Sequence, residues 1–158
     1  MKTSPWYERR VATVQRECPV AEAAKIMRDR HVGDVVVVET CAGGRMKPVG
    51  ILTDRDIVVG AIAEGMPLAK LLAQDLMADE LVTARESASL EEIVVTMRVS
   101  GVRRLPVVDG EGLLVGIITA DDVHKQLGEQ IAGLGKVPAH QRKHENEARP
   151  ERIAVAGK

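Results

Sequence analysis

A seven-residue stretch that occurs twice constrains the fold of this chain more than any other feature of its sequence. It reads Gly-Ile-Leu-Thr-Asp-Arg-Asp at residues 50–56 and Gly-Ile-Ile-Thr-Ala-Asp-Asp at residues 116–122. In each copy a glycine admits close approach of another segment, two branched aliphatic residues end a buried strand, and Thr-x-x-Asp opens a helix. The sequence therefore predicts two equivalent strand-to-helix corners, which the rest of the chain holds in place.

The segments around the two corners follow one order: strand, helix, strand, strand, helix. In the first copy we expect a strand at 11–14, a helix opened by Cys18-Pro19, strands at 34–38 and 48–52, and a helix from Thr53 to about Ala63. In the second copy we expect a strand at 81–83, a helix opened by the capping box Ser89-x-x-Glu92, strands at 103–108 and 113–118, and a helix from Thr119. The copies differ in length only at the hairpin turn, as expected of an internal repeat.

These patterns divide the chain into five segments and predict an α+β fold. The segments are an N-terminal arm at 1–10, a first repeat at 11–66, a connector at 67–77, a second repeat at 78–128 and a polar, partly disordered tail at 129–158. Each repeat has an apolar face to bury. We therefore expect two β-α-β-β-α repeats that pack with pseudo-two-fold symmetry and leave a cleft between their corners.

Composition excludes several classes of function. The 158 residues carry a net charge of -1 and include one Trp, one Tyr and no Phe, so neither a basic field nor an aromatic platform is present for nucleic acid. No apolar run is long enough to span a bilayer, and the start does not resemble an export signal. Cys18 and Cys41 fit no metal-ligand spacing. We expect a cytoplasmic protein with reduced thiols that binds neither membrane nor nucleic acid.

The Thr-x-x-Asp corners have two interpretations. Threonine at a helix start with an acid three residues later forms a capping box, which satisfies unpaired backbone N–H groups. A carboxylate at a helix N-terminus can also accept hydrogen bonds from ribose hydroxyls, and the adjacent hydroxyl and N–H groups can bind phosphate. The recurrence of the whole context, and the use of Asp in both copies where a capping box prefers Glu, favour a ligand site.

Residues 8 to 128 resemble a tandem pair of cystathionine-β-synthase (CBS) domains. The resemblance rests on the two corners, the two repeats and the segment Val-Arg-Arg-Leu-Pro-Val-Val-Asp at 102–109. The resemblance implies a stand-alone regulatory module with no catalytic residues, no cofactor and no metal. It implies clefts that bind AMP, ADP or ATP, with S-adenosylmethionine and NAD(H) as further candidates. It also implies a regulated partner protein and a homodimer. We expect the homodimer interface on the exposed helix faces around Ile57, Ala61, Val123 and Leu127.

The resemblance also assigns roles to single residues. It implies that the ribose is bound by Thr53 with Asp56 and by Thr119 with Asp122. Arg103 and Arg104 match a basic pair that faces ligand phosphates, and Arg55 is a weaker phosphate candidate. The positions that enclose the base are Thr13, Val32, Thr83, Val102 and Pro106.

The first repeat departs from this pattern at one place. Gly33 and Asp34 stand where the second repeat has Arg103 and Arg104, so the phosphate partners are not duplicated. An acid near a polyphosphate opposes binding. We therefore expect two inequivalent clefts. Arg103 and Arg104 are equally compatible with solvated strand residues, and Pro106 with an edge strand.

Three other functions compete with a nucleotide sensor. The first is a ligand-free dimerisation or interaction scaffold that docks through Trp6, Tyr7 or the tail. The second is an enzyme, for which the sequence offers no nucleophile set; His140 and His144 lack the glutamate of a metalloprotease helix. The third is DNA binding by the basic part of the tail.

His31 lies near the end of the helix opened by Cys18-Pro19. Its side chain is compatible with a role in stabilising the negative end of the helix dipole.

Overall fold

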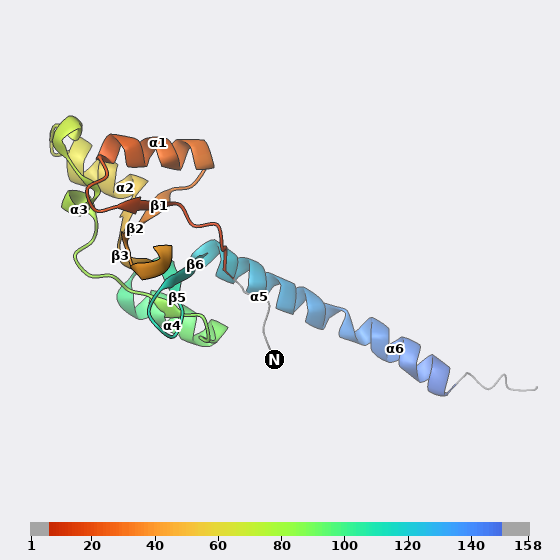
Figure 1. Cartoon of the computed structure of the whole chain (residues 1–158). Coiled ribbons are helices and arrows are strands. Elements are labelled where there is room, and N and C mark those ends of the chain that lie inside the picture. Colours follow the sequence, from red (N-terminus) through yellow and green to blue (C-terminus); the bar gives the residue numbers. More distant parts are fainter. Residues whose placement is uncertain (1–6, 150–158) are drawn as a thin grey trace, which may run out of the picture. The chain divides into compact units, whose positions relative to one another are not determined.

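The computed structural model describes residues 7–149, so the predictions for Trp6 and for the last nine residues lie outside the described part (Figure 1). The chain divides into two compact units, Met1–Val123 and His124–Lys158. The first unit contains the whole first repeat and the second repeat as far as Val123. The two units are described separately below.

The first repeat contains all the elements that the sequence predicts. Its elements are β1 (Thr13–Gln15), α1 (Val20–Arg30), β2 (Asp34–Thr40), the short turn η1 (Ala42–Gly44), β3 (Met46–Thr53), α2 (Asp54–Ile57) and the π-helical turn η2 (Val58–Ile62). Strand β2 is central, parallel to β1 and antiparallel to β3. The connector forms η3 (Leu68–Lys70) and α3 (Ala73–Leu76).

The second repeat has the same order and confirms the α+β fold of two β-α-β-β-α repeats. Its elements are β4 (Ala84–Arg85), α4 (Leu90–Ser100), β5 (Arg104–Val108), β6 (Leu114–Thr119) and the start of α5 (Ala120–Gly135). The strand predicted at 81–83 was misplaced. Its β-branched residues suggested a strand, but pairing begins only at Ala84, which lies opposite Val107.

The run of valines in β2 is explained by burial on both of its faces. Val35 and Val37 pack with α1 and α2 in one apolar cluster, whereas Val36 and Val38 pack with Ile117 of the second repeat. Because successive side chains of a strand point to opposite faces, a strand between a helix layer and another sheet needs apolar residues at every position. In the first unit the two sheets thus lie between α1 and α2 on one side and α4 on the other (Figure 1).

The two glycines of the repeated stretch accommodate reciprocal contacts between the repeats. A Cβ atom at Gly116 would lie 2.1 Å from a ring carbon of Tyr7, in the segment that precedes the first repeat. A Cβ atom at Gly50 would lie 2.4 Å from the sulfur of Met77, which precedes the second repeat. Next to Tyr7, Glu8 exchanges two backbone hydrogen bonds with Ile117. Each repeat therefore receives the leading segment of the other, as the predicted pseudo-two-fold packing requires.

The helix positions expected at an interface are mostly buried. Ile57, Ala61 and Val123 belong to the two cores, where their side chains contact the sheets. The expectation of exposure was wrong for these three because the apolar period alone does not tell which face of a short helix meets the sheet. The exposed apolar side chains near the first corner are those of Val58, Val59, Ile62 and Met66.

The second unit is helical over most of its length. Helix α5 continues to Gly135, and α6 spans Val137–Ala148 with Pro138 in its first turn, where proline is tolerated. The spacing of apolar residues typical of a helix fades after Gly128, but the helical structure continues beyond that residue. Among residues 7–149, no helix has the length and apolar character needed to cross a membrane.

Candidate functional site

Each Thr-x-x-Asp corner closes a capping box at the end of a buried strand. At the first corner, the Asp56 N–H donates to Thr53 Oγ1 at 3.1 Å, and the Thr53 N–H donates to Asp56 Oδ2 at 2.8 Å. At the second corner the matching distances are 3.3 Å and 2.8 Å, and the Thr119 hydroxyl also donates to Asp122 Oδ2 at 2.7 Å. The helix-capping interpretation of these residues is therefore satisfied in both repeats.

The capping role does not exhaust the hydrogen-bonding capacity of either aspartate. The bonds that the two carboxylates accept all use Oδ2, so Oδ1 of Asp56 and of Asp122 has no hydrogen-bond partner among residues 7–149. Both side chains are half-buried. A carboxylate oxygen of this kind can accept a hydrogen bond from a ligand hydroxyl without breaking the cap.

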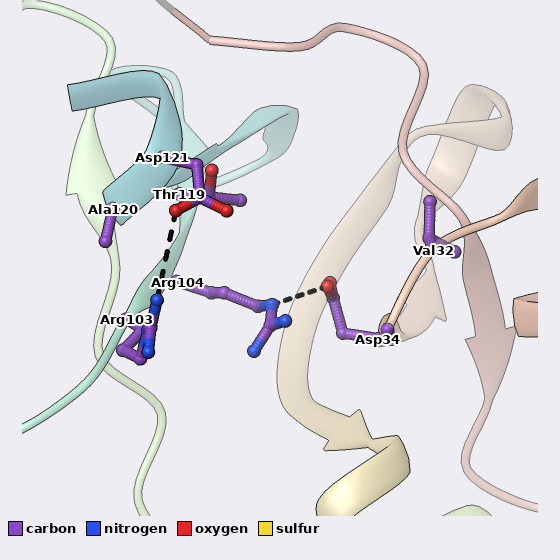
Figure 2. Close-up of a pocket in the computed structure, with 8 residues that line it drawn as sticks. Val32, Asp34, Arg103, Arg104, Thr119, Ala120 and Asp121 are labelled. Carbon is purple, nitrogen blue, oxygen red and sulfur yellow. Dashed lines mark ion pairs between the residues drawn. The ribbon is translucent and has the colours of Figure 1, made fainter. Parts of the chain in front are cut away.

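A cavity of about 200 Å³ lies between the two repeats, beside the second corner (Figure 2). The first repeat contributes the loop between α1 and β2, and the second contributes the start of β5 and the corner that follows β6. The lining residues are Val32, Gly33, Asp34, Arg103, Arg104, Thr119, Ala120 and Asp121. Four residues that the sequence analysis assigns to a ligand site therefore meet here, namely Val32, Arg103, Arg104 and Thr119.

The other assigned residues do not line this cavity. Thr83 lines a separate cavity of about 310 Å³ with residues of β4 and α4, and the Thr13 hydroxyl faces the sulfur of Met46. Val102 packs on the core of the second repeat, and Pro106 is fully buried in β5. Thr53, Asp56 and Asp122 stand at the corners outside the lining, and Arg55 is exposed. The described residues thus bring together only part of the predicted set.

Both arginines of the cavity are already paired with carboxylates (Figure 2). Arg104 Nε lies 2.7 Å from Asp34 Oδ1, and this ion pair joins the two repeats. Arg103 lies 3.8 Å from Asp121, but both side chains are more than three-quarters exposed, so this pair contributes little. The sequence analysis missed Asp121 as a lining residue, although its place between Thr119 and Asp122 in the corner could have indicated it.

Asp34 has an unusual electrostatic environment. Burial raises the pKa of its carboxyl group above the usual range, and the nearby Asp54 acts in the same direction, whereas the ion pair with Arg104 opposes the rise. The side chain of Asp34 is only 12% exposed, so water screens these charges weakly. The surroundings of Asp34 therefore disfavour the charged form of its carboxyl group.

The two histidines of the second unit lie on one face of α6. His140 and His144 line a hollow with Gly133, Lys136, Val137 and Gln141, and the His140 ring is 3.2 Å from the Lys136 carbonyl. In the described part of the chain, they do not form part of a group of three or more potential metal ligands.

Comparison with known proteins gives one match over each repeat. The family model described as CBS domain matches residues 7–60 and 73–129. An uncharacterized protein, MK0525, from Methanopyrus kandleri is 36% identical over 102 residues, which are 65% of this chain and 50% of that protein. This chain thus aligns with only half of the archaeal protein. The CBS domain-containing protein YhcV of Bacillus subtilis is 37% identical over 124 residues, covering 78% of this chain and 84% of that protein.

Two solved structures show the same fold with ligands bound. The CBS domain pair of protein MJ0100, in complex with 5′-methylthioadenosine and S-adenosyl-L-methionine, is 26% identical with a TM-score of 0.69, covering 82% of this chain and 99% of that chain. CBS domain protein PAE2072 from Pyrobaculum aerophilum, complexed with AMP, is 22% identical with a TM-score of 0.67, covering 77% of this chain and 89% of that chain.

Proposed function

Since this chain belongs to the family of proteins with tandem CBS domains, we propose that it is a regulatory module that binds an adenosine-containing nucleotide between its two repeats. Ligand binding changes how the module packs against a second copy or a partner protein. The proposal assigns the chain no reaction of its own. A ligand shifts such packing only when it binds one arrangement better than the other.

The observation that carries this proposal is the cavity to which both repeats contribute. It combines a threonine at a helix start, two arginines and an exposed apolar residue, Val32, next to Gly33. These groups suit ribose, phosphate and the face of a base respectively. Adenosine compounds bound in two structural neighbours, 5′-methylthioadenosine with S-adenosyl-L-methionine in one and AMP in the other, support this choice of ligand class.

The proposed roles follow the sequence analysis. We propose that Thr119, which lines the observed cavity, and Asp122, which belongs to the same corner, contact the ribose of a ligand. Arg103 and Arg104 face its phosphates. Thr53, Asp56 and Arg55 would serve a second ligand at the first corner. The base would lie against residues drawn from Thr13, Val32, Thr83, Val102 and Pro106.

Replacement of Asp122 tests the ribose role. In Asp122→Ala we expect a loss of AMP and ATP affinity, measured by isothermal titration calorimetry, of tenfold or more. We expect a loss of only about 1 kcal/mol in unfolding free energy, since that is the value of a helix cap. Asp75→Ala is the matched control, because Asp75 accepts the Leu72 N–H at 2.8 Å in the same way but belongs to α3 of the connector and to neither Thr-x-x-Asp corner. Unchanged affinity in Asp122→Ala, with the same stability loss as the control, would leave this carboxylate only a cap.

One observation favours a second function, the ligand-free scaffold. Both Thr-x-x-Asp corners are internally hydrogen bonded, and Arg104 is paired within the protein. A site whose polar groups satisfy one another does not need a ligand. If no adenosine compound binds, the fold serves to hold surfaces for other proteins.

The proposed assembly is a homodimer. The exposed apolar residues Val58, Val59 and Ile62 follow the first corner directly, so they are placed to couple a change at the corner to a second copy.

Cys18 and Cys41 are both free thiols. Free thiols fit the reducing cytoplasm in which we propose that the module acts.

A further inference from the structure

Asp34 and Arg104 occupy equivalent places in the two repeats. Each is the first residue of the central strand of its sheet, and each lies opposite the corner threonine, Asp34 opposite Thr53 and Arg104 opposite Thr119. The two repeats therefore have an acidic and a basic residue at the same position. In the cavity, Arg104 Nε lies 2.7 Å from Asp34 Oδ1. Neither side chain would have this partner if the two repeats were identical.

The guanidinium group of Arg104 lies close to the first repeat. A Cβ atom at Gly33 would lie 3.2 Å from Arg104 Nη2 and 3.3 Å from Asp54 Oδ2, so the arginine and a second acid both approach this glycine. Asp54 makes no salt bridge among residues 7–149 and repels Asp34. Arg104 thus reaches from its own repeat into an acidic corner of the other.

A phosphate that binds Arg104 through Nε has to replace Asp34 as its partner, and one that binds through the Nη atoms has to share the guanidinium group with that carboxylate. The displaced carboxylate would remain in a place where it is only 12% exposed, beside Asp54 and without its cation. Leaving a buried charge unpaired is costly. Arg103 carries no such restriction, because its own pair with Asp121 is long and exposed.

We propose that Asp34 is an internal competitor of the ligand phosphates for Arg104, and that it thereby selects adenosine compounds of low negative charge over polyphosphates. This inference rests on the proposed function, since it concerns the same cavity. The repulsion from Asp34 and Asp54 grows with each negative charge on the ligand. ATP is therefore penalised more than AMP, and uncharged adenosine is not penalised.

The test compares adenosine, AMP and ATP on the full chain by isothermal titration calorimetry, in magnesium-free buffer at constant ionic strength. Asp34→Asn removes the charge and nearly keeps the shape of the side chain. We expect it to tighten ATP binding on the order of tenfold, AMP binding by less, and adenosine binding not at all. Asp34→Glu retains the charge and should keep the preference of the unmodified chain. Asp34→Ser provides a second neutral variant if Asp34→Asn does not fold.

The same measurement in an Arg104→Gln background separates competition from general repulsion. If Asp34 acts by holding Arg104, the gain from Asp34→Asn should largely disappear when Arg104 is absent. A gain of equal size in both backgrounds, or no gain in ATP affinity from either neutral variant, would overturn the inference while leaving the nucleotide site intact. If none of the three compounds binds the unmodified chain or Asp34→Asn, the inference is overturned. The proposed function fails with it when ADP, NAD(H) and S-adenosylmethionine do not bind either.

Discussion

At the scale of single residues, the ion pair between Asp34 and Arg104 contributes less to stability than its short distance suggests. Burial and the repulsion from Asp54 raise the pKa of the Asp34 carboxyl group despite the nearby arginine. A raised pKa means that the folded state holds its proton more tightly than the unfolded chain does. The charged form of Asp34 therefore destabilises the folded state.

This destabilisation has a defined pH dependence. Because the folded-state pKa of Asp34 lies above the unfolded value of about 3.9, its favourable contribution is complete below pH 3.9 and is lost as the pH rises through the folded-state pKa. We expect the unfolding free energy of the unmodified chain to fall relative to that of Asp34→Asn between pH 4 and pH 7. Urea unfolding of both proteins across this range measures the difference. A relative gain with rising pH would mean that the attraction of Arg104 outweighs burial.

At the scale of the elements, the glycines of the repeated stretch keep the repeats together. Tyr7 approaches Gly116 so closely that a Cβ atom there would also lie 2.9 Å from the Glu8 carbonyl oxygen. At Gly50 the nearest atoms all belong to the Met77 side chain. The Met77 side chain can change its rotamer to make room. The Glu8 carbonyl cannot easily move, because the backbone of Glu8 exchanges two hydrogen bonds with Ile117.

Alanine at the two glycines should therefore have unequal effects. We expect Gly116→Ala to lower the unfolding free energy by about 1–3 kcal/mol through overpacking, and Gly50→Ala to lower it by less. Chemical denaturation of the two variants provides the comparison, each serving as the control for the other. Equal losses would show that Met77 is held as rigidly as the Tyr7 segment. No loss at Gly116 would contradict the close packing of the N-terminal segment.

The fold could be predicted from the sequence because the repeat supplies an internal check on each element. The valines of β2, the capping box before α4 and the two corners all have strong local signals, and all formed as expected. The strand at 81–83 was misplaced, since strand pairing depends on a distant partner that propensity does not identify. The burial of Ile57 and Ala61 was missed for the same reason, because it depends on how α2 and η2 meet the sheet.

The candidate site was only partly accessible to sequence reasoning. Counting along the repeats placed Asp34 at the position of Arg104, and the strand registers confirm this equivalence. The sequence did not reveal that the two side chains would pair with each other. That contact depends on the packing of one repeat against the other, which no local pattern encodes.

At the scale of the whole molecule, apolar packing and ion pairs join the two repeats in addition to the contacts at the two glycines. Apolar side chains of β2, β3 and β6 pack between the sheets. On one side of this cluster Asp34 pairs with Arg104, and at the hairpin turns Arg45 of the first repeat pairs with Asp109 at 2.6 Å and also with Glu111. A ligand that releases Arg104 therefore acts on one of these connections while the others remain, and such a change can alter packing without unfolding.

Thermal unfolding of the full chain with adenosine, AMP, ADP, ATP, NAD(H) and S-adenosylmethionine, each at millimolar excess, shows whether a nucleotide binds the folded protein. A ligand present at 100 times its dissociation constant, and binding only the folded state, adds about 2.7 kcal/mol to the unfolding free energy and raises the midpoint by several degrees. We expect such a rise with at least one of these compounds and a smaller rise in Asp122→Ala. An unchanged midpoint with every compound would contradict a nucleotide site between the repeats and favour the ligand-free scaffold.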